Sequence, residues 1–170
     1  MPEKPQGELT YLMGGEIDRG SFELVVRGDN IDPEEITRLL GAEPTTAHRT
    51  GALSDNGKYR HRTGSWNLQT GELDFRSGDR NCEDQFADWV ASLPGDEAIW
   101  ARILEQHEAY VWMVLYMNTW NREFDVRPST LNELGKRGLR LHIDTYYDPD
   151  DEEPNQTLED TGAGAPSPQR

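Results

Sequence analysis

The sequence contains only one cysteine, Cys82, among its 170 residues. A single thiol forms no disulfide within the chain, so nothing in the sequence points to an oxidising compartment. Long apolar runs are also missing, because the longest, residues 110–117, falls far short of the roughly 18 residues that a membrane span needs. The polar residues 1–5 lack the apolar centre of a signal peptide. We therefore predict a cytoplasmic protein without a membrane segment.

Motifs of metal sites and catalytic centres are missing as well. No histidine falls at zinc-ligand spacing, and no P-loop or Gly-x-Ser-x-Gly elbow occurs. The histidines are His48, His61, His107 and His142. Cys82 precedes an expected helix, whose dipole can lower a thiol pKa, but without a nucleophile signature we interpret it as a plain thiol. The sequence predicts no metal and no cofactor, and it favours a role other than catalysis.

Positive charge is scarce: 17 lysines and arginines face 32 acids, for a net charge of −15 at pH 7. Residues 148–170 hold seven acids and one arginine and contribute −6, which leaves about −9 for the rest of the chain. A field of this sign repels phosphate backbones, so we expect no binding of nucleic acid. The same field suits either plain solubility or a basic protein partner, and both interpretations stay open.

The clearest local signal predicts a short helix over residues 33–40. Asp32 is a typical N-cap, and Pro33 suits the first helical position. Asp32 together with Glu35 approximates a capping box. Gly41 supplies the left-handed stop that commonly ends a helix.

Hydrophobic periodicity predicts the remaining elements. Strands are expected at residues 21–27, 65–70, 110–117 and 139–147, helices near 86–93, 96–104 and 129–138, a turn at 55–57 and a polar loop at 71–81. Residues 110–117 are apolar on both faces, which is typical of a central strand. The order β-α-β(β)-α-β-α-β predicts an α+β fold with a mixed or antiparallel sheet, helices on one face, in a ferredoxin-like arrangement.

The two ends of the sequence differ from the single domain expected at residues 20–147. Residues 1–19 are polar and glycine-rich, and we expect them to be mobile. Residues 148–170 are first acidic and then rich in glycine, alanine and proline. Because such a segment buries too little apolar area to offset the entropy of ordering, we expect a disordered tail.

Several short motifs carry a resemblance to a known family. They are residues 28–37, which run into Asp-Pro-x-x-Ile-Thr, then Leu40-Gly41, Pro44-Thr45, Gly51, residues 64–66 and the closing residues 139–146. In these motifs the chain resembles the bacterial domain-of-unknown-function family DUF4279 over about residues 20–147. The resemblance implies this fold and a bacterial origin, and it implies no reaction.

Cations gather in residues 48–62 of this otherwise acidic chain. They are His48, Arg49, Lys58, Arg60, His61 and Arg62, and Trp66 follows them. Such a cluster beside an aromatic ring can hold an anion, a carboxylate or an acidic peptide. Alternatively, the arginines offset the domain's own acids and keep a long loop docked. On the first interpretation, the candidate binding residues are Arg49, Arg60, His61, Arg62 and Trp66.

Two further candidates lie in the expected strands. Trp112 either sits with Tyr116 on an uncovered sheet face, where exposed aromatics mark an interaction surface, or packs under the long loop. Asp144 needs a partner if it is covered, and it otherwise belongs to charge pairs on an exposed face. An RNA-binding sheet also displays aromatics, but normally in a basic domain.

We therefore expect a non-catalytic module that binds a protein or a small ligand. One specific form is an immunity-type protein that neutralises a basic toxin, because acidic surfaces steer onto basic partners. The alternative is an enzyme whose site combines the 48–62 loop with Trp66 and Asp144, which requires the loop to fold over the sheet and close a pocket. The sequence leaves the oligomeric state open, and dimerisation through a sheet edge or an aromatic face is compatible with it.

Overall fold

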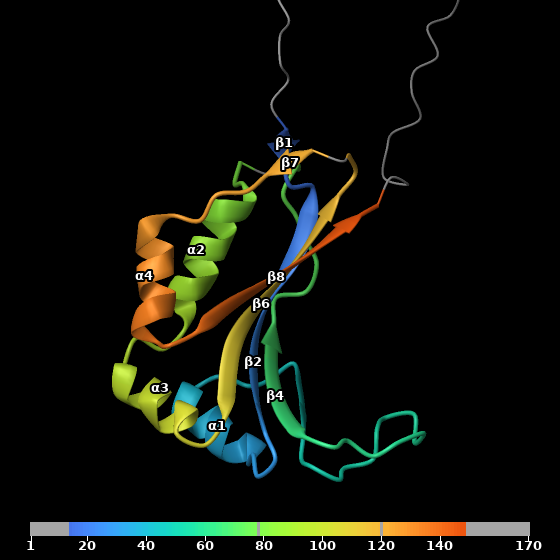
Figure 1. Ribbon diagram of the computed structural model, residues 1–170, viewed down its shortest axis with the longest axis vertical. Helices are drawn as coiled ribbons and strands as arrows, with labels where there is room; N and C mark the ends of the chain where they lie inside the picture. The colour runs from blue at the N-terminus through green and yellow to red at the C-terminus, as the bar shows by residue number, and fades with distance from the viewer. Residues whose placement is uncertain (1–13, 78, 120, 149–170) are drawn as a thin grey trace, which may run out of the picture.

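The structure, a computed structural model, describes residues 14–77, 79–119 and 121–148. In this part of the chain four helices lie together on one side of a twisted sheet (Figure 1). The helices are α1 (Pro33–Leu40), α2 (Cys82–Ser92), α3 (Glu97–Leu104) and α4 (Pro128–Lys136). The strands are β1 (Gly15–Glu16), β2 (Arg19–Gly28), β3 (Thr46–His48), β4 (Gly64–Gln69), β5 (Leu73–Asp74), β6 (Glu108–Met117), β7 (Arg122–Glu123) and β8 (Arg140–Tyr147).

The large sheet has the strand order β3-β4-β2-β6-β8, and β5 pairs with the start of β2. β2 runs antiparallel to β4 and β6, whereas β8 runs parallel to β6 at the edge. β1 and β7 form a small parallel ladder of their own. The predicted α+β class is confirmed. The ferredoxin-like arrangement is not reproduced as a whole, because β8 adds a parallel strand beyond the four antiparallel ones.

The core lies between the sheet and the helices, and strand periodicity determines which side chains enter it. Phe22, Leu24 and Val26 of β2 are fully buried on the helix side. Val111 and Met113 of β6 are buried on the same side. Successive side chains of a strand point to opposite faces, so the intervening residues of β6 lie on the other face, where they are half-buried. The prediction that residues 110–117 form an interior strand is confirmed.

Local signals determine α1 as predicted. The Asp32 carboxylate accepts a hydrogen bond from the Glu34 N–H at 3.1 Å, and Gly41 ends the helix with a φ of 65°. The predicted capping box is wrong in one part. The Glu35 side chain accepts a hydrogen bond from Arg102 of α3 rather than closing back on the helix start.

Two predicted segments contain more structure than their polarity indicated. The loop expected at residues 71–81 includes β5 and Phe75, which is 2% exposed and stacks near Phe22 at 6.1 Å between ring centroids. The segment expected to be mobile, residues 1–19, includes β1 and the buried Ile17. Its residues 1–13 lie outside the described residues.

The predicted disordered tail falls almost entirely outside the described residues, which end at Asp148. Asp148 itself is ion-paired with Arg19 at 2.5 Å. No helix in the described ranges is both long and apolar enough to cross a bilayer.

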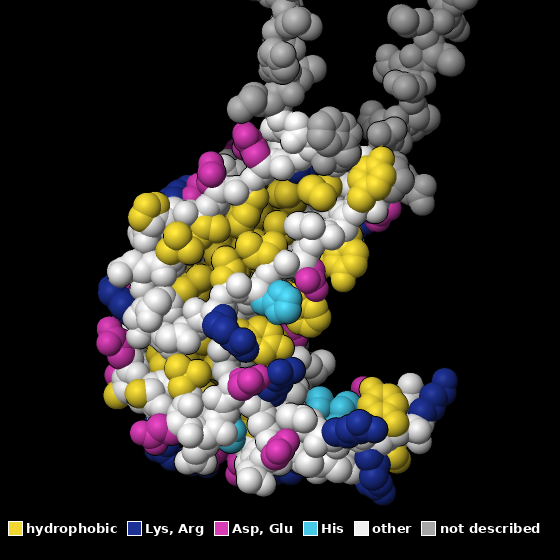
Figure 2. Space-filling model, in the orientation of Figure 1, with side chains coloured by type: hydrophobic (Ala, Val, Ile, Leu, Met, Phe, Trp, Pro, Cys, Tyr) yellow, Lys and Arg dark blue, Asp and Glu magenta, His cyan; other side chains and the backbone are white. Residues whose placement is uncertain are grey.

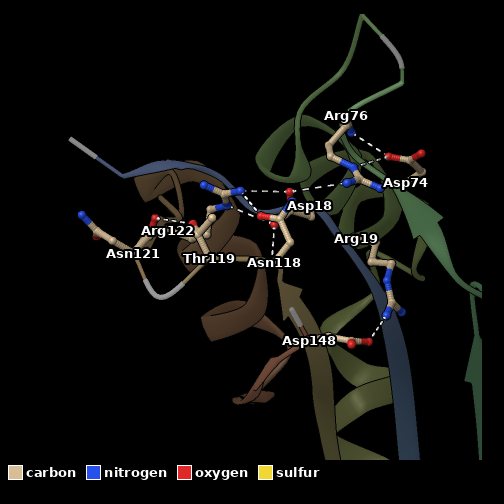
Figure 3. Close-up of polar contacts among 9 residues, drawn as sticks. All are labelled: Asp18, Arg19, Asp74, Arg76, Asn118, Thr119, Asn121, Arg122 and Asp148. Carbon is tan, nitrogen blue, oxygen red and sulfur yellow. Dashed lines mark hydrogen bonds and ion pairs between the residues drawn. The ribbon is translucent and has the colours of Figure 1, made fainter. Parts of the chain in front are cut away.

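A buried carboxylate, Asp18, joins the segments at one end of the sheet (Figure 3). It accepts hydrogen bonds from Arg122 Nε at 3.0 Å and Nη2 at 3.2 Å, and from the Asn118 N–H at 2.9 Å. Burial alone raises the pKa of Asp18, but the hydrogen bonds from Arg122 and Asn118 outweigh it and lower the pKa below its ordinary value. This ion pair therefore anchors the start of β2 to the turn after β6.

We expect Asp18→Asn to lower the free energy of unfolding by about 3 kcal/mol at pH 7, because it leaves the guanidinium of Arg122 largely buried without its counter-charge. Chemical denaturation followed by circular dichroism measures the loss. Because the pKa of Asp18 is lower in the folded state, its stabilisation is present above the ordinary pKa of 3.8 and is lost as the pH falls through the folded value. The difference between wild type and variant should therefore shrink below about pH 4.

The matched control is Asp74→Asn, which removes an exposed carboxylate 3.7 Å from Arg76. This variant should unfold almost as the wild type does, because exposed ion pairs contribute little. Equal destabilisation by both substitutions would show that Asp18 acts only through net charge.

Candidate functional site

The sheet has one face that no helix of the described chain covers, and we call it the open face (Figure 1). By strand register its side chains are Thr46 and His48 of β3, Ser65, Asn67 and Gln69 of β4, Arg19, Ser21, Glu23, Val25 and Arg27 of β2, Glu108, Tyr110, Trp112, Val114 and Tyr116 of β6, and Arg140, His142, Asp144 and Tyr146 of β8. Figure 2 shows the molecule hollowed on this side. The open face is thus a shallow surface rich in aromatic and charged side chains.

Trp112 lies at the centre of the open face. It is paired with Glu23 across β2 and with His142 across β8. The indole Nε1–H of Trp112 donates to Asp144 Oδ2 at 3.1 Å. His142 Nε2 lies 3.6 Å from the other oxygen of Asp144. The structure therefore brings together two of the predicted candidates, Trp112 and Asp144.

Glu23 is the carboxylate on the opposite side of Trp112. It is half-buried, and its Oε1 accepts a hydrogen bond from Asn67 Nδ2 at 2.8 Å. Asn67 is oriented in turn by the Ser65 hydroxyl, which donates to Asn67 Oδ1 at 2.7 Å. Burial raises the pKa of Glu23, and the hydrogen bond from Asn67 opposes this in part.

Sequence reasoning did not select Glu23 or Asn67 as candidates. Hydrophobic periodicity placed Glu23 only within an expected strand at residues 21–27. Its position beside Trp112 depends on the pairing of β2 with β6, two strands that are far apart in the chain.

The arginines around the open face are engaged by the domain itself. Arg27 donates to Glu108 at 2.8 Å, which lowers the pKa of Glu108. Arg19 pairs with acids and lies 4.2 Å from the ring centroid of Tyr116. Neither of the central carboxylates, on Glu23 and Asp144, is paired with an arginine or lysine of the described residues.

Residues 49–62, which we call the arm, extend away from the sheet between β3 and β4 (Figure 1). Backbone hydrogen bonds from Gly51 N to His61 O at 2.8 Å and from Ser54 N to Tyr59 O at 2.9 Å fold it back on itself. Its tip turns at the predicted position, residues 55–57, where the sequence places a glycine with a φ of 68°. The arm borders the hollow beside the open face (Figure 2).

The cations of the arm do not form one cluster. Arg49 pairs with Asp32 at 2.7 Å and with Glu34, so it offsets the domain's own acids, which was the alternative interpretation of the cationic loop. Arg60 donates to the Gly51 carbonyl at 2.8 Å. Arg62 is exposed and makes no hydrogen bond or ion pair with the residues that the structure describes.

Trp66 is fully buried, on the helix side of β4, and its indole N–H donates to the Thr37 hydroxyl at 3.0 Å. It therefore offers no contact surface, and its selection as a binding residue is corrected. Asp144 on β8 and the arm beyond β3 lie at opposite edges of the sheet, four strand spacings or roughly 19 Å apart. A single site combining the arm, Trp66 and Asp144 is not formed.

Cys82 is the first residue of α2 and is 3% exposed. Burial raises the pKa of its thiol to about 12, and the charges of Glu16 and Glu83 add to the effect. The helix dipole therefore does not lower the pKa of Cys82, and the interpretation of this residue as a plain thiol holds. Within the described ranges no group of three or more histidine, cysteine or acidic side chains is placed to hold a metal ion.

Two histidines stack where the arm joins β3. The ring centroids of His48 and His61 lie 3.5 Å apart, and Tyr59 packs edge-on against His61 at 5.3 Å. Burial lowers the pKa of His48, and the neighbouring His61 lowers it further. Protonation of this stack therefore costs stability.

Comparison with known protein families gives a match. The family model described as "Domain of unknown function (DUF4279)" matches residues 18–148. This confirms the resemblance inferred from the sequence motifs, with bounds that begin at the buried Asp18. No curated protein and no solved structure matches the chain.

The stacked histidines predict a pH dependence. In an NMR titration we expect His48 to titrate below its ordinary pKa of 6.5. The stabilisation by the neutral stack is then present above 6.5 and is lost as the pH falls through the folded pKa. His61→Phe keeps a ring but removes the charge, so the pKa of His48 should rise only in part, because burial is the larger cause.

The matched control is His142→Gln, which changes a histidine at the far edge of the sheet and should leave the titration of His48 unchanged. A pKa of His48 at or above 6.5 in the wild type would contradict the stacked arrangement.

Proposed function

The chain belongs to the DUF4279 family, and we propose that it is a non-catalytic binding module whose open face takes a basic protein partner. One observation carries this proposal. Trp112 lies between Glu23 and Asp144, two carboxylates without an arginine or lysine partner among the described residues. Such an arrangement is complementary to a cationic side chain.

A lysine or arginine of the partner fits over the indole of Trp112. A cation over a tryptophan face gains about 0.5–2 kcal/mol, depending on how far it is desolvated. Its N–H groups then donate to the free lone pairs of Glu23 or of Asp144 in charge-assisted hydrogen bonds. An arginine adds planar stacking to this contact, so it is the better occupant of the two.

The charge of the whole chain supports the same class of partner. A net charge of −15 steers basic proteins toward the surface and disfavours nucleic acid. In the specific form that we propose, the protein acts in a bacterial cytoplasm and neutralises a basic toxin, as an immunity-type protein does. The single cysteine is compatible with that compartment.

The shape of the surface favours a protein over a small molecule. A depression of about 220 Å³ beside Tyr110 and His142 is smaller than the roughly 300–1,000 Å³ clefts that usually hold small ligands. The broader hollow between the open face and the arm suits a protuberance of a protein partner instead (Figure 2).

Titration of the full chain with a fluorescent oligoarginine peptide at low salt tests the proposal. We expect Glu23→Gln and Asp144→Asn each to weaken binding about fivefold, the effect of removing one exposed ion pair of roughly 1 kcal/mol. Trp112→Leu should weaken binding to a similar extent by removing the aromatic face. Fluorescence anisotropy measures the dissociation constants.

The charge-matched control is Glu97→Gln, which removes an exposed acid from α3 on the helix side. It should leave the affinity nearly unchanged. If it weakens binding as much as Glu23→Gln does, the peptide binds diffusely to the acidic surface and the proposed site is wrong.

A further inference from the structure

β8 is an edge strand whose outer side is unpaired in the described part of the chain. The Asp148 N–H donates to the Met117 carbonyl of β6 at 2.8 Å. In a parallel pair, alternate residues direct both backbone groups to the neighbouring strand. Even-numbered residues of β8 therefore bond to β6. The backbone N–H and C=O groups of Leu141, Ile143 and Thr145 consequently point outward.

This edge lacks several of the features that keep edge strands from pairing. β8 contains no proline, glycine or lysine, and its register with β6 runs unbroken along its whole length. Large hydrophobic side chains are exposed on it: Ile143 is 42% exposed, Tyr146 49% and Tyr147 58%. Figure 2 shows further hydrophobic side chains gathered beside β8 on the side of α2 and α4. A long, regular edge that exposes large hydrophobic side chains is a template for another strand.

We propose that β8 pairs antiparallel with β8 of a second copy of the chain, with the two-fold axis passing beside Ile143. A two-fold axis requires antiparallel pairing, because both copies use the same surface. Ile143 then faces Ile143 of the second copy, and Leu141 faces Thr145 of the second copy. These residues carry the outward backbone groups, so the pairs are hydrogen-bonded ones.

In the same register, the side chains of the even-numbered residues of β8 are complementary across the two copies. On the open face, His142 lies opposite Asp144 of the second copy, and Asp144 lies opposite the second copy's His142. Arg140 lies opposite Tyr146 of the second copy, in the position of a cation over a ring, much as Arg140 already lies 5.6 Å from the centroid of Tyr110. Opposite charges and cation–aromatic pairs directly across a ladder stabilise it.

Neighbouring registers are less favourable. Moving the axis to Asp144 places two carboxylates directly opposite each other, which destabilises a ladder. Moving it to His142 shortens the overlap to residues 140–144. The register centred on Ile143 keeps residues 140–146 of both copies paired without a like-charge pair.

The dimer makes one continuous sheet from two copies and places both open faces on the same side. Each copy keeps its own Trp112 and Glu23, whereas Asp144 also faces His142 of the second copy. The inference rests on the edge strand alone and does not depend on the proposed binding function. A monomer that still binds the peptide would contradict the dimer alone. A dimer that does not bind the peptide would contradict the binding function alone.

Sedimentation velocity of the full chain from about 1 to 200 µM tests the dimer by mass action. We expect the mass to rise toward twice the chain mass of 19.4 kDa. Ile143→Lys and Ile143→Glu should each weaken the dimer roughly tenfold or more, because each variant opposes like charges across the axis. An equimolar mixture of the two variants should form a heterodimer at wild-type strength, because residue 143 then faces its opposite charge.

A wild type that stays monomeric overturns the proposal, as do variants that dimerise unchanged or a mixture that stays monomeric. Ile143→Val, which keeps the β-branched shape, is the control and should dimerise.

Amide hydrogen exchange of the wild type provides a test without mutation. The outward amides of Leu141, Ile143 and Thr145 should exchange slowly only at high concentration, whereas the amides of His142 and Asp144 should be protected at all concentrations. Outward amides that exchange quickly at every concentration overturn the pairing.

Discussion

Burial of one side of the central strands under four helices is the constraint from which the rest of the structure follows. Period-two alternation sends Val111 and Met113 into the core and leaves Trp112 between them on the other face. All four helices pack on one side of the sheet, so no helix of the described chain covers the other side (Figure 1). The open face is therefore a direct consequence of how the core is built. The Asp18–Arg122 ion pair then holds the ends of β2 and β6 in register.

Electrostatics determines what this surface can recognise. Arginines near its margins are neutralised by neighbouring acids, as Arg27 is by Glu108. The centre of the open face differs from its margins, because its carboxylates accept hydrogen bonds from neutral groups. Glu23 accepts one from the Asn67 amide, and Asp144 accepts one from the Trp112 indole. The centre thus presents acceptors and an aromatic face, and the neighbouring cationic side chains of β8 are Arg140 and His142. Within the arm, Arg49 pairs with acids beside α1, whereas Arg62 is exposed and makes no ion pair with the described residues.

Local signals could be predicted from the sequence, whereas cross-strand relations could not. Asp32 and Gly41 flank α1 in the chain, so they determine its bounds without any knowledge of the fold. Trp66 lies between polar residues and Trp112 between apolar ones, yet Trp66 is in the core and Trp112 is on the open face. A strand residue belongs to the core or to the surface according to which face of the strand the helices cover. Tertiary packing determines that face. Glu23 was missed for the same reason, because its partner on β6 is set by strand register.

The central claim is that recognition occurs on the open face and that cations drive it. The most direct measurement is an NMR chemical-shift footprint of the wild-type chain titrated with oligoarginine peptide at low and high salt. The account predicts shifts of the Trp112 indole N–H and of backbone amides in β2, β6 and β8, and these shifts should disappear at high salt. Shifts confined to the helix side, or shifts that persist unchanged at high salt, would contradict it.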